Sequence, residues 1–284
     1  MNKVLLFFVV LSCACSVYGQ SGTEFSFFNN KTGQSQPLIV GHRGGFDADM
    51  PENSIEMFDY TYMNSCGKPV GIEFDIRESL SGSLFIMHDS TVDRTTNGNG
   101  KISLLPDSYI KTLFLKDKNG NMTTERIPLF LDVLAHFQDQ NIILMLDVKG
   151  KIYPEVIRLV TEMKMESKCI LLTFNLKNTK LVNDATGKIM ISALVLNKSD
   201  WESLCKLQIP NQQLIAYISK ETPPELITEI YQNKVLVMTD MSESIYNKSK
   251  HYNSDYYRNF LAKMHMGIMI TDYPMYVNNI FCKE

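Results

Sequence analysis

Short apolar runs recur along the chain from residue 38 onward, and polar or turn-forming residues bound each of them. Most runs are continuous rather than alternating, which is typical of strands that are covered on both faces. The nine runs are LIVGHR (38–43), VGIEFDI (70–76), LFIMHD (84–89), IILMLDVK (142–149), CILLTF (169–174), KIMISALVL (188–196), QLIAYIS (213–219), KVLVMTD (234–240) and GIMITD (267–272).

Amphipathic stretches lie between these runs and predict helices. Examples are NSIEMFDYTYMNS (53–65), IPLFLDVLAHFQDQ (127–140), YPEVIRLVTEMKME (153–166) and PPELITEIYQ (223–232). Strands that alternate with helices in this way indicate an α/β fold with a parallel sheet.

The second and third apolar runs must pair differently from the rest. Only the seven residues from Arg77 to Ser83 separate them, whereas a parallel partner needs a crossover of about a dozen residues or more. They therefore predict an antiparallel hairpin, and eight parallel strands remain, the number in a TIM barrel. The predicted fold class is α/β: a (β/α)8 TIM barrel with an extra β-hairpin after the second strand and an inserted segment near 90–128.

The register of this hairpin depends on its turn. If Ser81 and Gly82 form a two-residue turn, Asp75 lies opposite His88, although a slip of one residue would change that pairing. In either register the hairpin returns His88 to the mouth of the barrel, where Glu73 and Asp75 lie.

The N-terminal residues predict a signal peptide, 1–19. Lys3 precedes an apolar run from Val4 to Leu11, and small residues lead up to Gly19, after which we expect cleavage. We therefore expect a secreted protein, or a periplasmic one in a bacterium. A polar segment (20–36) and one barrel domain (37–284) follow.

The sequence also bears on lipid attachment and on membrane-spanning segments. Cys13 or Cys15 would be the attachment point in an alternative, lipid-anchored form, although no convincing lipobox precedes either. Beyond the signal peptide no segment reaches 18 consecutive apolar residues, so we expect no transmembrane segment.

Charge and cysteine content narrow the function classes. The formal net charge is −3, and loss of Lys3 makes it −4. Nucleic acid is therefore not an expected partner, since a basic face would be needed to neutralise phosphates.

Cleavage leaves Cys66, Cys169, Cys205 and Cys282, which permit two disulfides in any of three pairings or, alternatively, free thiols. Glycosylation sequons occur at Asn30, Asn121, Asn197 and Asn247.

Charged residues gather where the predicted strands end. Glu73 and Asp75 are two apart on one strand, so both point to the same face. Two parallel carboxylates repel each other unless a cation lies between them, and oxygen ligands suit Mg²⁺ or Ca²⁺. Asp147 and Lys149 share a face of another strand in the same way. His42 and Arg43 end the first strand, and the carboxyl ends of barrel strands carry the active site.

Several short elements together resemble the glycerophosphodiester phosphodiesterase family. They are HRG (42–44), PENS (51–54), ExD (73–75), HD (88–89) and DRTTNGNG (93–100), and the resemblance continues through IPLFLDVL, DVK and TF to GIMITDYP. It therefore covers nearly the whole expected mature chain, and the order and spacing of these elements are specific.

The resemblance implies a role for each matching residue. Glu73, Asp75 and Asp147 match metal ligands for a divalent cation, Mg²⁺ or Ca²⁺. His42 and His88 match the paired catalytic histidines, and we expect His88 as the acid and His42 as the base. The remaining matches are substrate-binding, Arg43 and Lys149, and supporting, Glu52 and Asn53, with direct contact between Glu52 and the metal left open.

The implied function is a secreted, metal-dependent phosphodiesterase that acts on a small molecule. It would hydrolyse glycerophosphodiesters to glycerol 3-phosphate and an alcohol such as choline or ethanolamine. The sequence departs from the family at Asp147, where Glu is usual, and at VMTD (237–240), where a tryptophan-containing WTVN-like segment is common. The second departure puts the aromatic wall of the substrate pocket in doubt.

Two other functions remain open from the sequence. A phospholipase D of the spider-toxin type, acting on lysophospholipid or sphingolipid with a cyclic phosphate product, resembles this family and uses Asp at the position of Asp147. The alternative from a different class is a non-catalytic secreted barrel that binds phosphate esters, matrix or another protein.

Overall fold

The computed structural model describes residues 37–246, 250–264 and 266–282. The expected signal peptide and the polar segment that follows it lie outside these residues. Eight parallel strands close into a barrel because β1 pairs with both β2 and β11, which confirms the predicted (β/α)8 fold. In chain order they are β1 (Leu38–Gly41), β2 (Val70–Glu78), β6 (Ile143–Val148), β7 (Cys169–Thr173), β8 (Met190–Leu194), β9 (Leu214–Ile218), β10 (Leu236–Asp240) and β11 (Ile268–Thr271).

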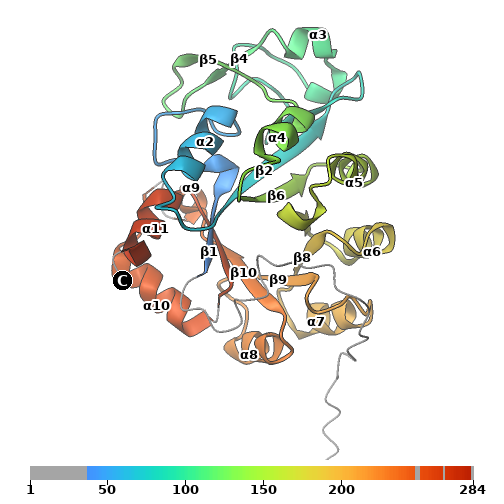
Figure 1. The fold of residues 1–284 in the computed structure, drawn as a ribbon, viewed down its shortest axis with the longest axis vertical. Coiled ribbons are helices and arrows are strands. Elements are labelled where there is room, and N and C mark those ends of the chain that lie inside the picture. Colours follow the sequence, from blue (N-terminus) through green and yellow to red (C-terminus); the bar gives the residue numbers. More distant parts are fainter. Residues whose placement is uncertain (1–36, 247–249, 265, 283–284) are drawn as a thin grey trace, which may run out of the picture.

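Helices surround the strands, as Figure 1 shows most clearly for the ring from α5 to α8. Local sequence fixes several helix starts: the Ser54 hydroxyl accepts a hydrogen bond from the Met57 amide, and Asn175 and Asn197 cap two other helices in the same way. The longer helices are α2 (Ile55–Met63), α4 (Phe130–Phe137), α5 (Tyr153–Glu162), α6 (Leu176–Ala185), α7 (Lys198–Cys205), α8 (Pro224–Gln232), α10 (Ser254–Met264) and α11 (Pro274–Cys282). The short ones are α3 (Asp107–Ile110), α9 (Glu243–Tyr246) and the 3-10 turns η1 (His42–Gly44), η2 (Ile102–Leu104) and η3 (Glu166–Lys168).

Side chains alternate between two apolar cores along each strand. On β6, Leu144 and Leu146 pack outward against the helices, whereas Ile143 and Met145 fill the barrel interior. The next inward position on this strand is Asp147. The period of two therefore places apolar residues deep in the barrel and a charged residue at its mouth.

The predicted hairpin is present, but its expected register is wrong by one residue. β3 (Leu84–Ile86) pairs antiparallel to β2, with Glu78 opposite Leu84. The Ser79 amide bonds the Ser83 carbonyl, so the loop contains three residues, and Gly82 takes the left-handed conformation (φ 87°) that such a loop needs. Asp75 consequently lies opposite Met87, whose amide bonds its carbonyl, and not opposite His88.

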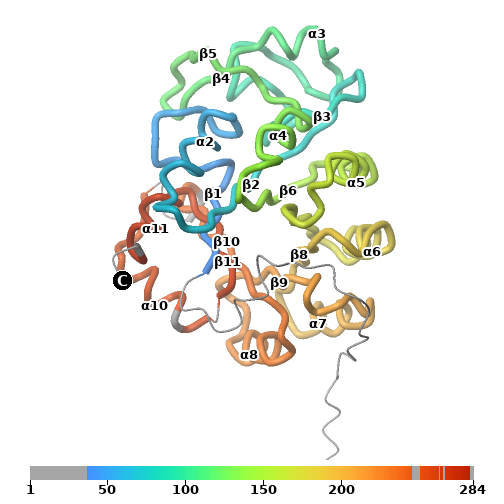
Figure 2. The backbone as a smooth tube through the Cα atoms, in the orientation of Figure 1, coloured from blue at the N-terminus to red at the C-terminus, as the bar shows by residue number. Residues whose placement is uncertain are grey.

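The inserted segment folds beside the barrel. It contains a two-stranded sheet of β4 (Phe114–Lys116) and β5 (Met122–Arg126), and Figure 2 shows it on the side where β3 leaves the barrel. A separate apolar cluster that includes Phe85, Val92 and Ile110 anchors it. The segment is thus packed against β3 and is more ordered than a pair of loops.

The structure bears on only some of the cysteines and glycosylation sequons. No disulfide joins Cys66, Cys169 and Cys205 to one another, and the side chain of Cys282 lies outside the described residues. Of the sequons, Asn121 and Asn197 are exposed, whereas Asn30 and Asn247 are not described. Within the described residues no helix is both long and apolar enough to span a bilayer.

Gly41, at the end of β1, has no room for a side chain. A Cβ there would lie 2.4 Å from the Gly44 carbonyl oxygen, and backbone cannot yield as a side chain can. We expect Gly41→Ala to lower the free energy of unfolding by about 1–3 kcal/mol or more, measured by urea denaturation. Gly187→Ala is the control because a Cβ there meets nothing within 4 Å. Equal stability of the two variants would contradict this tight turn.

Candidate active site

Three buried carboxylates meet at the mouth of the barrel, as the sequence predicts. Glu73 and Asp75 come from β2, and the parallel register places Asp147 of β6 directly beside Asp75. Each can offer an oxygen so that all three atoms lie within 4.8 Å of one another. Their exposed fractions are only 1–7%.

Such a cluster is electrostatically costly without a cation. Burial and the nearby charge of Asp75 raise the pKa of Glu73 to about 8, and burial also raises the pKa of Asp147. A divalent cation would favour the charged form of all three groups. The donor set consists of carboxylate oxygens, which suits Mg²⁺ or Ca²⁺ better than softer metals. These residues therefore fit the expected cation.

Lys149 lies against the same cluster. Its ammonium nitrogen is 2.9 Å from Asp75 Oδ1 and 2.5 Å from Asp147 Oδ2. Burial would raise the pKa of Asp75, but Lys149, His88 and Arg43 together hold it below its usual range. The sequence predicts that Lys149 holds substrate phosphate, and its place beside the carboxylates puts its charge within reach of a phosphate bound there.

Arg43 occupies a constrained position next to the cluster. Its backbone is left-handed (φ 51°), and its amide donates to Glu73 Oε2 at 2.9 Å. The guanidinium donates to Glu52 at 3.1 Å, while its Nε lies 3.7 Å from Asp75 Oδ2 and makes no hydrogen bond within the described part of the chain. A buried donor without a partner favours a ligand such as phosphate at this point.

The two supporting residues have different tasks. Asn53 donates from Nδ2 to Asp75 Oδ2 at 3.0 Å and so fixes that carboxylate. Glu52 accepts hydrogen bonds from both Arg43 and Arg94. Glu52 is thus engaged by two guanidinium groups.

His42 is held by a carboxylate from the opposite end of the sequence. Its Nδ1 lies 2.7 Å from Asp272 Oδ1, and Asp272 is 1% exposed. Burial lowers the pKa of His42, but the hydrogen bond to Asp272 and the charges of Glu73 and Asp240 outweigh it and raise the pKa to about 9. These contacts favour the protonated form of His42 in the cation-free protein.

His88 has a carboxylate partner as well, but a more solvated one. Its Nδ1 lies 2.7 Å from Asp89, and its side chain is 36% exposed. Arg94 donates to both oxygens of Asp89 and holds the pKa of that carboxyl well below its usual range. Arg77 fixes the backbone by donating to the His88 carbonyl. His88 thus stays near Asp75 although it lies beyond the ladder of β3.

Sequence reasoning assigned no role to Asp272, Asp89 or Arg94. Asp272 follows the last apolar run, so the rule that strand ends carry the site could have found it. Asp89 and Arg94 stand in the HD and DRTTNGNG elements, yet only the fold shows that they form a chain of ion pairs from His88 to Glu52.

The chain is similar to known proteins of one family. Residues 42–274 match the Glycerophosphoryl diester phosphodiesterase family. A glycerophosphodiester phosphodiesterase of Caldanaerobacter subterraneus subsp. tengcongensis is 32% identical over 145 residues, which are 49% of this chain and 58% of that protein. Human glycerophosphodiester phosphodiesterase 1 is 32% identical over 39% of this chain and 33% of its own. The matches thus span about a third to a little over half of these relatives.

Solved structures match over most of the chain. A glycerophosphoryl diester phosphodiesterase from Parabacteroides distasonis has a TM-score of 0.77 and 27% identity, over 87% of this chain and 86% of its own. An Oleispira antarctica phosphodiesterase in complex with the product sn-glycerol-3-phosphate has a TM-score of 0.65 and 19% identity, over 87% and 97%. At 19% identity, the similarity to the Oleispira antarctica protein shows a shared fold only.

The carboxylate cluster predicts a stability that depends on divalent cations. Adding Mg²⁺ or Ca²⁺ at about 100 times the dissociation constant should stabilise the protein by about 2.7 kcal/mol, or roughly 5–10 °C in Tm, because the cation neutralises the buried charges. Scanning calorimetry with and without EDTA measures this shift. Asp147→Asn should remove most of it, whereas the exposed Asp139→Asn should leave it intact. An identical Tm with EDTA and with either cation would exclude a cation at this cluster.

Proposed function

We propose, from the premise that this chain belongs to the glycerophosphoryl diester phosphodiesterase family, that it hydrolyses a glycerophosphodiester to glycerol 3-phosphate and an alcohol. The observation that carries this proposal is the cluster of three buried carboxylates flanked by two histidines, each with its own carboxylate partner. A barrel that only bound phosphate esters would not need two such pairs of groups.

The substrate phosphate would lie between the cluster and the basic side chains. Arg43 offers its unpartnered Nε, and Lys149 offers an ammonium group beside Asp75 and Asp147. Both would neutralise negative charge that grows on the phosphoryl oxygens. A divalent cation held by Glu73, Asp75 and Asp147 would supply further electrostatic stabilisation of that charge when bound.

The environments of the histidines favour a role for each that reverses the sequence-based expectation. His42 keeps its proton because buried Asp272 faces it, so we assign it as the acid that protonates the leaving alkoxide. The charge of Asp89 is already offset by Arg94, which leaves His88 better suited to accept a proton from the attacking hydroxyl. That hydroxyl belongs either to water or to the glycerol itself.

A second candidate substrate is a lysophospholipid, with a cyclic phosphate as the product. Asp147 already suggested this reading, and the structure adds three exposed apolar side chains after β7 and β8: Phe174, Leu176 and Leu196 are 43–45% exposed. Such residues could contact an acyl chain.

Localisation is a separate part of the proposal. The expected signal peptide would place either activity outside the cytoplasm. Detection of a processed chain in the culture medium or periplasm would test this.

Products distinguish these possibilities directly. Phosphorus NMR of glycerophosphocholine and lysophosphatidylcholine, each incubated with the protein and Mg²⁺ or Ca²⁺, should show a phosphomonoester from the first substrate. His42→Asn and Glu73→Gln should each reduce the rate by about 100-fold or more because an acid and a buried charge are lost. A cyclic phosphate from the lysolipid would instead favour the second candidate, and unchanged substrates with both cations would contradict catalysis.

The pair of His42 and Asp272 predicts a pH dependence. In the cation-free protein, NMR titration should give His42 a pKa of about 9, far above those of unperturbed histidines. Asp272→Asn removes the hydrogen-bonded charge, so this pKa should fall by more than one unit. If His42 is the acid, the alkaline limb of the kcat/KM profile moves to lower pH in this variant. A limb that does not move would contradict the assignment.

A further inference from the structure

A completely buried carboxylate that the proposed mechanism does not use lies next to Asp272. Glu243 begins α9, and its side chain has no contact with solvent. Its Oε1 accepts hydrogen bonds from the hydroxyls of Tyr257 and Thr271, and its Oε2 accepts one from the Asp272 amide at 2.9 Å. All three of these donors are uncharged. Removing a carboxylate from water is costly, and an apolar side chain could fill the same space without that cost.

Glu243 and the residue after it hold Asp272 at two points. The Glu243 side chain accepts the hydrogen bond of the Asp272 backbone amide, and the Ser244 amide donates to Asp272 Oδ2 at 2.5 Å. The other carboxylate oxygen, Oδ1, faces His42 Nδ1 at 2.7 Å. Because the backbone and one oxygen of Asp272 are fixed, the direction in which the second oxygen holds the His42 ring is fixed as well.

The two hydroxyl donors extend this network to both sides of Asp272. Thr271 ends β11 and donates to Glu243 Oε1 at 2.8 Å, while its own oxygen accepts from the Tyr273 amide at 3.1 Å. Tyr257 of α10 donates to the same oxygen of Glu243. The residues before and after Asp272 therefore belong to one hydrogen-bond network, and the Glu243 carboxylate is its centre.

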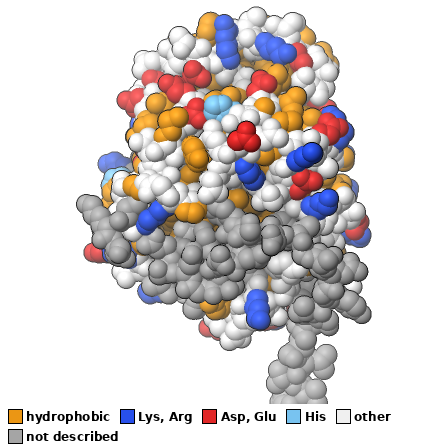
Figure 3. All heavy atoms as spheres, in the orientation of Figure 1, with side chains coloured by type: hydrophobic (Ala, Val, Ile, Leu, Met, Phe, Trp, Pro, Cys, Tyr) orange, Lys and Arg blue, Asp and Glu red, His pale blue; other side chains and the backbone are white. Residues whose placement is uncertain are grey.

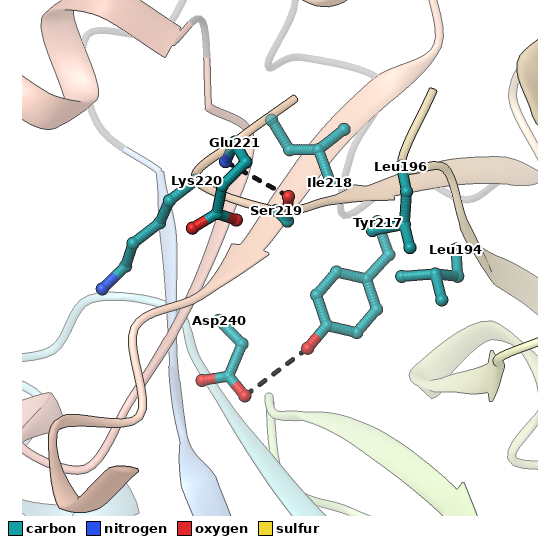
Figure 4. A pocket seen from close by; sticks show the side chains of 8 residues that line it. All are labelled: Leu194, Leu196, Tyr217, Ile218, Ser219, Lys220, Glu221 and Asp240. Atoms are coloured by element: carbon teal, nitrogen blue, oxygen red, sulfur yellow. Dashed lines mark hydrogen bonds between the residues drawn. The ribbon is translucent and has the colours of Figure 1, made fainter. Parts of the chain in front are cut away.

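The other carboxylate near the His42 ring, Asp240 at the end of β10, is engaged by different groups. Figure 4 shows the Tyr217 hydroxyl pointing toward Asp240, and this hydroxyl donates to Oδ2 at 3.4 Å. Ser242 donates to Oδ1 from its amide at 2.8 Å and from its hydroxyl at 2.5 Å. The Ser242 hydroxyl lies 3.4 Å from His42 Nδ1, so Asp240 reaches the ring through an intermediate. The carboxylate that holds the ring directly is that of Asp272.

We propose that Glu243 is a positioning residue, which fixes Asp272 and, through it, the ring of His42. The proposal rests on the proposed function, in which His42 gives a proton to the leaving alkoxide as the bond between phosphorus and that oxygen breaks. Because Nδ1 faces Asp272, the proton that moves is the one on Nε2. A misplacement of about 1 Å can cost roughly 100-fold in rate, so the proton transfer needs a carboxylate partner that does not move.

Two conservative substitutions separate the position of Glu243 from its charge. Glu243→Gln loses the charge but keeps an oxygen for the Asp272 amide, and its amide group can donate to the two hydroxyls, which are able to accept. Glu243→Asp keeps the charge but withdraws the carboxylate from the Asp272 amide by the length of one methylene group. Positioning therefore predicts that Glu243→Asp is impaired and that Glu243→Gln stays close to wild type. The opposite order would overturn the proposal.

The choice of leaving group tests whether Glu243 acts through His42. Choline needs a proton when it leaves as an alkoxide, whereas p-nitrophenolate is stable without one. Glu243→Asp should lower kcat for glycerophosphocholine by about tenfold or more, but kcat for glycerophospho-p-nitrophenol by less than about twofold, with both KM values nearly unchanged. Equal losses of kcat for the two esters would contradict an action through the acid.

Gln213→Ala is the matched control for a lost set of buried hydrogen bonds. Gln213 is buried just before β9, at the end of the barrel opposite the mouth, and donates to the carbonyls of Thr186 and Ile189 at 3.0 Å. This variant should lower Tm but leave the ratio of kcat for the two esters unchanged. A change of that ratio as large as in Glu243→Asp would show that it reports stability, and would overturn the proposal.

A spectroscopic test does not depend on turnover. The proton between His42 Nδ1 and Asp272 should give a far-downfield NMR signal, assigned by its loss in His42→Asn. It should persist in Glu243→Gln and Gln213→Ala but broaden or vanish in Glu243→Asp, since a loosened hydrogen bond exchanges its proton with water faster. An unchanged signal in Glu243→Asp would overturn the proposal. If the signal responds as expected but no diester is hydrolysed, the proposed function fails while the placement of Asp272 by Glu243 stands.

Discussion

The rest of the site depends on the cost of placing three carboxylates together out of water. Glu73, Asp75 and Asp147 are almost completely buried, and each would be destabilising alone. Lys149, Arg43 and the Asn53 amide contact the cluster, and its three carboxylates offer oxygens close enough together to hold a metal ion. Most groups that contact the cluster are also groups that a phosphate needs, so balancing the charge prepares the binding site.

The two histidines differ in the charge balance around their carboxylate partners. Within the described residues, His42 is the cationic side chain that pairs with the buried carboxylate of Asp272, whereas Arg94 also holds Asp89, the partner of His88, near the surface. Arg94 in turn bonds Glu52, which orients Arg43. One chain of ion pairs thus runs from the exposed histidine to the buried cluster, and the inserted segment contributes Arg94 to the candidate active site. On the face drawn in Figure 3, acidic and basic side chains are interspersed.

Much of this arrangement follows from the alternation of inward-facing and outward-facing side chains along each strand, a period of two residues. The inward series of β6 runs through Ile143 and Met145 to Asp147, and its apolar members and charged end are visible without a structure. The register of the hairpin was not, because one glycine in a left-handed conformation changes a two-residue turn into a three-residue loop. The strand-end pattern points to Asp272 itself, but its pairing with His42 could not be predicted, since they are 230 residues apart in the sequence and only closure of the barrel brings them together.

Continuing an inward series one step beyond its last apolar residue describes most of the mouth. On β1, β2, β6, β10 and β11 this step gives charged or ionisable groups: His42, Glu73, Asp147, Asp240 and Asp272. On β7 and β9 it gives the aromatic residues Phe174 and Tyr217. The mouth therefore has a charged half that suits a phosphodiester and an aromatic half that suits an organic group. In the strand order around the barrel, Asp147 on β6 and Asp240 on β10 border the aromatic half, whereas His42 on β1 lies at the centre of the charged half.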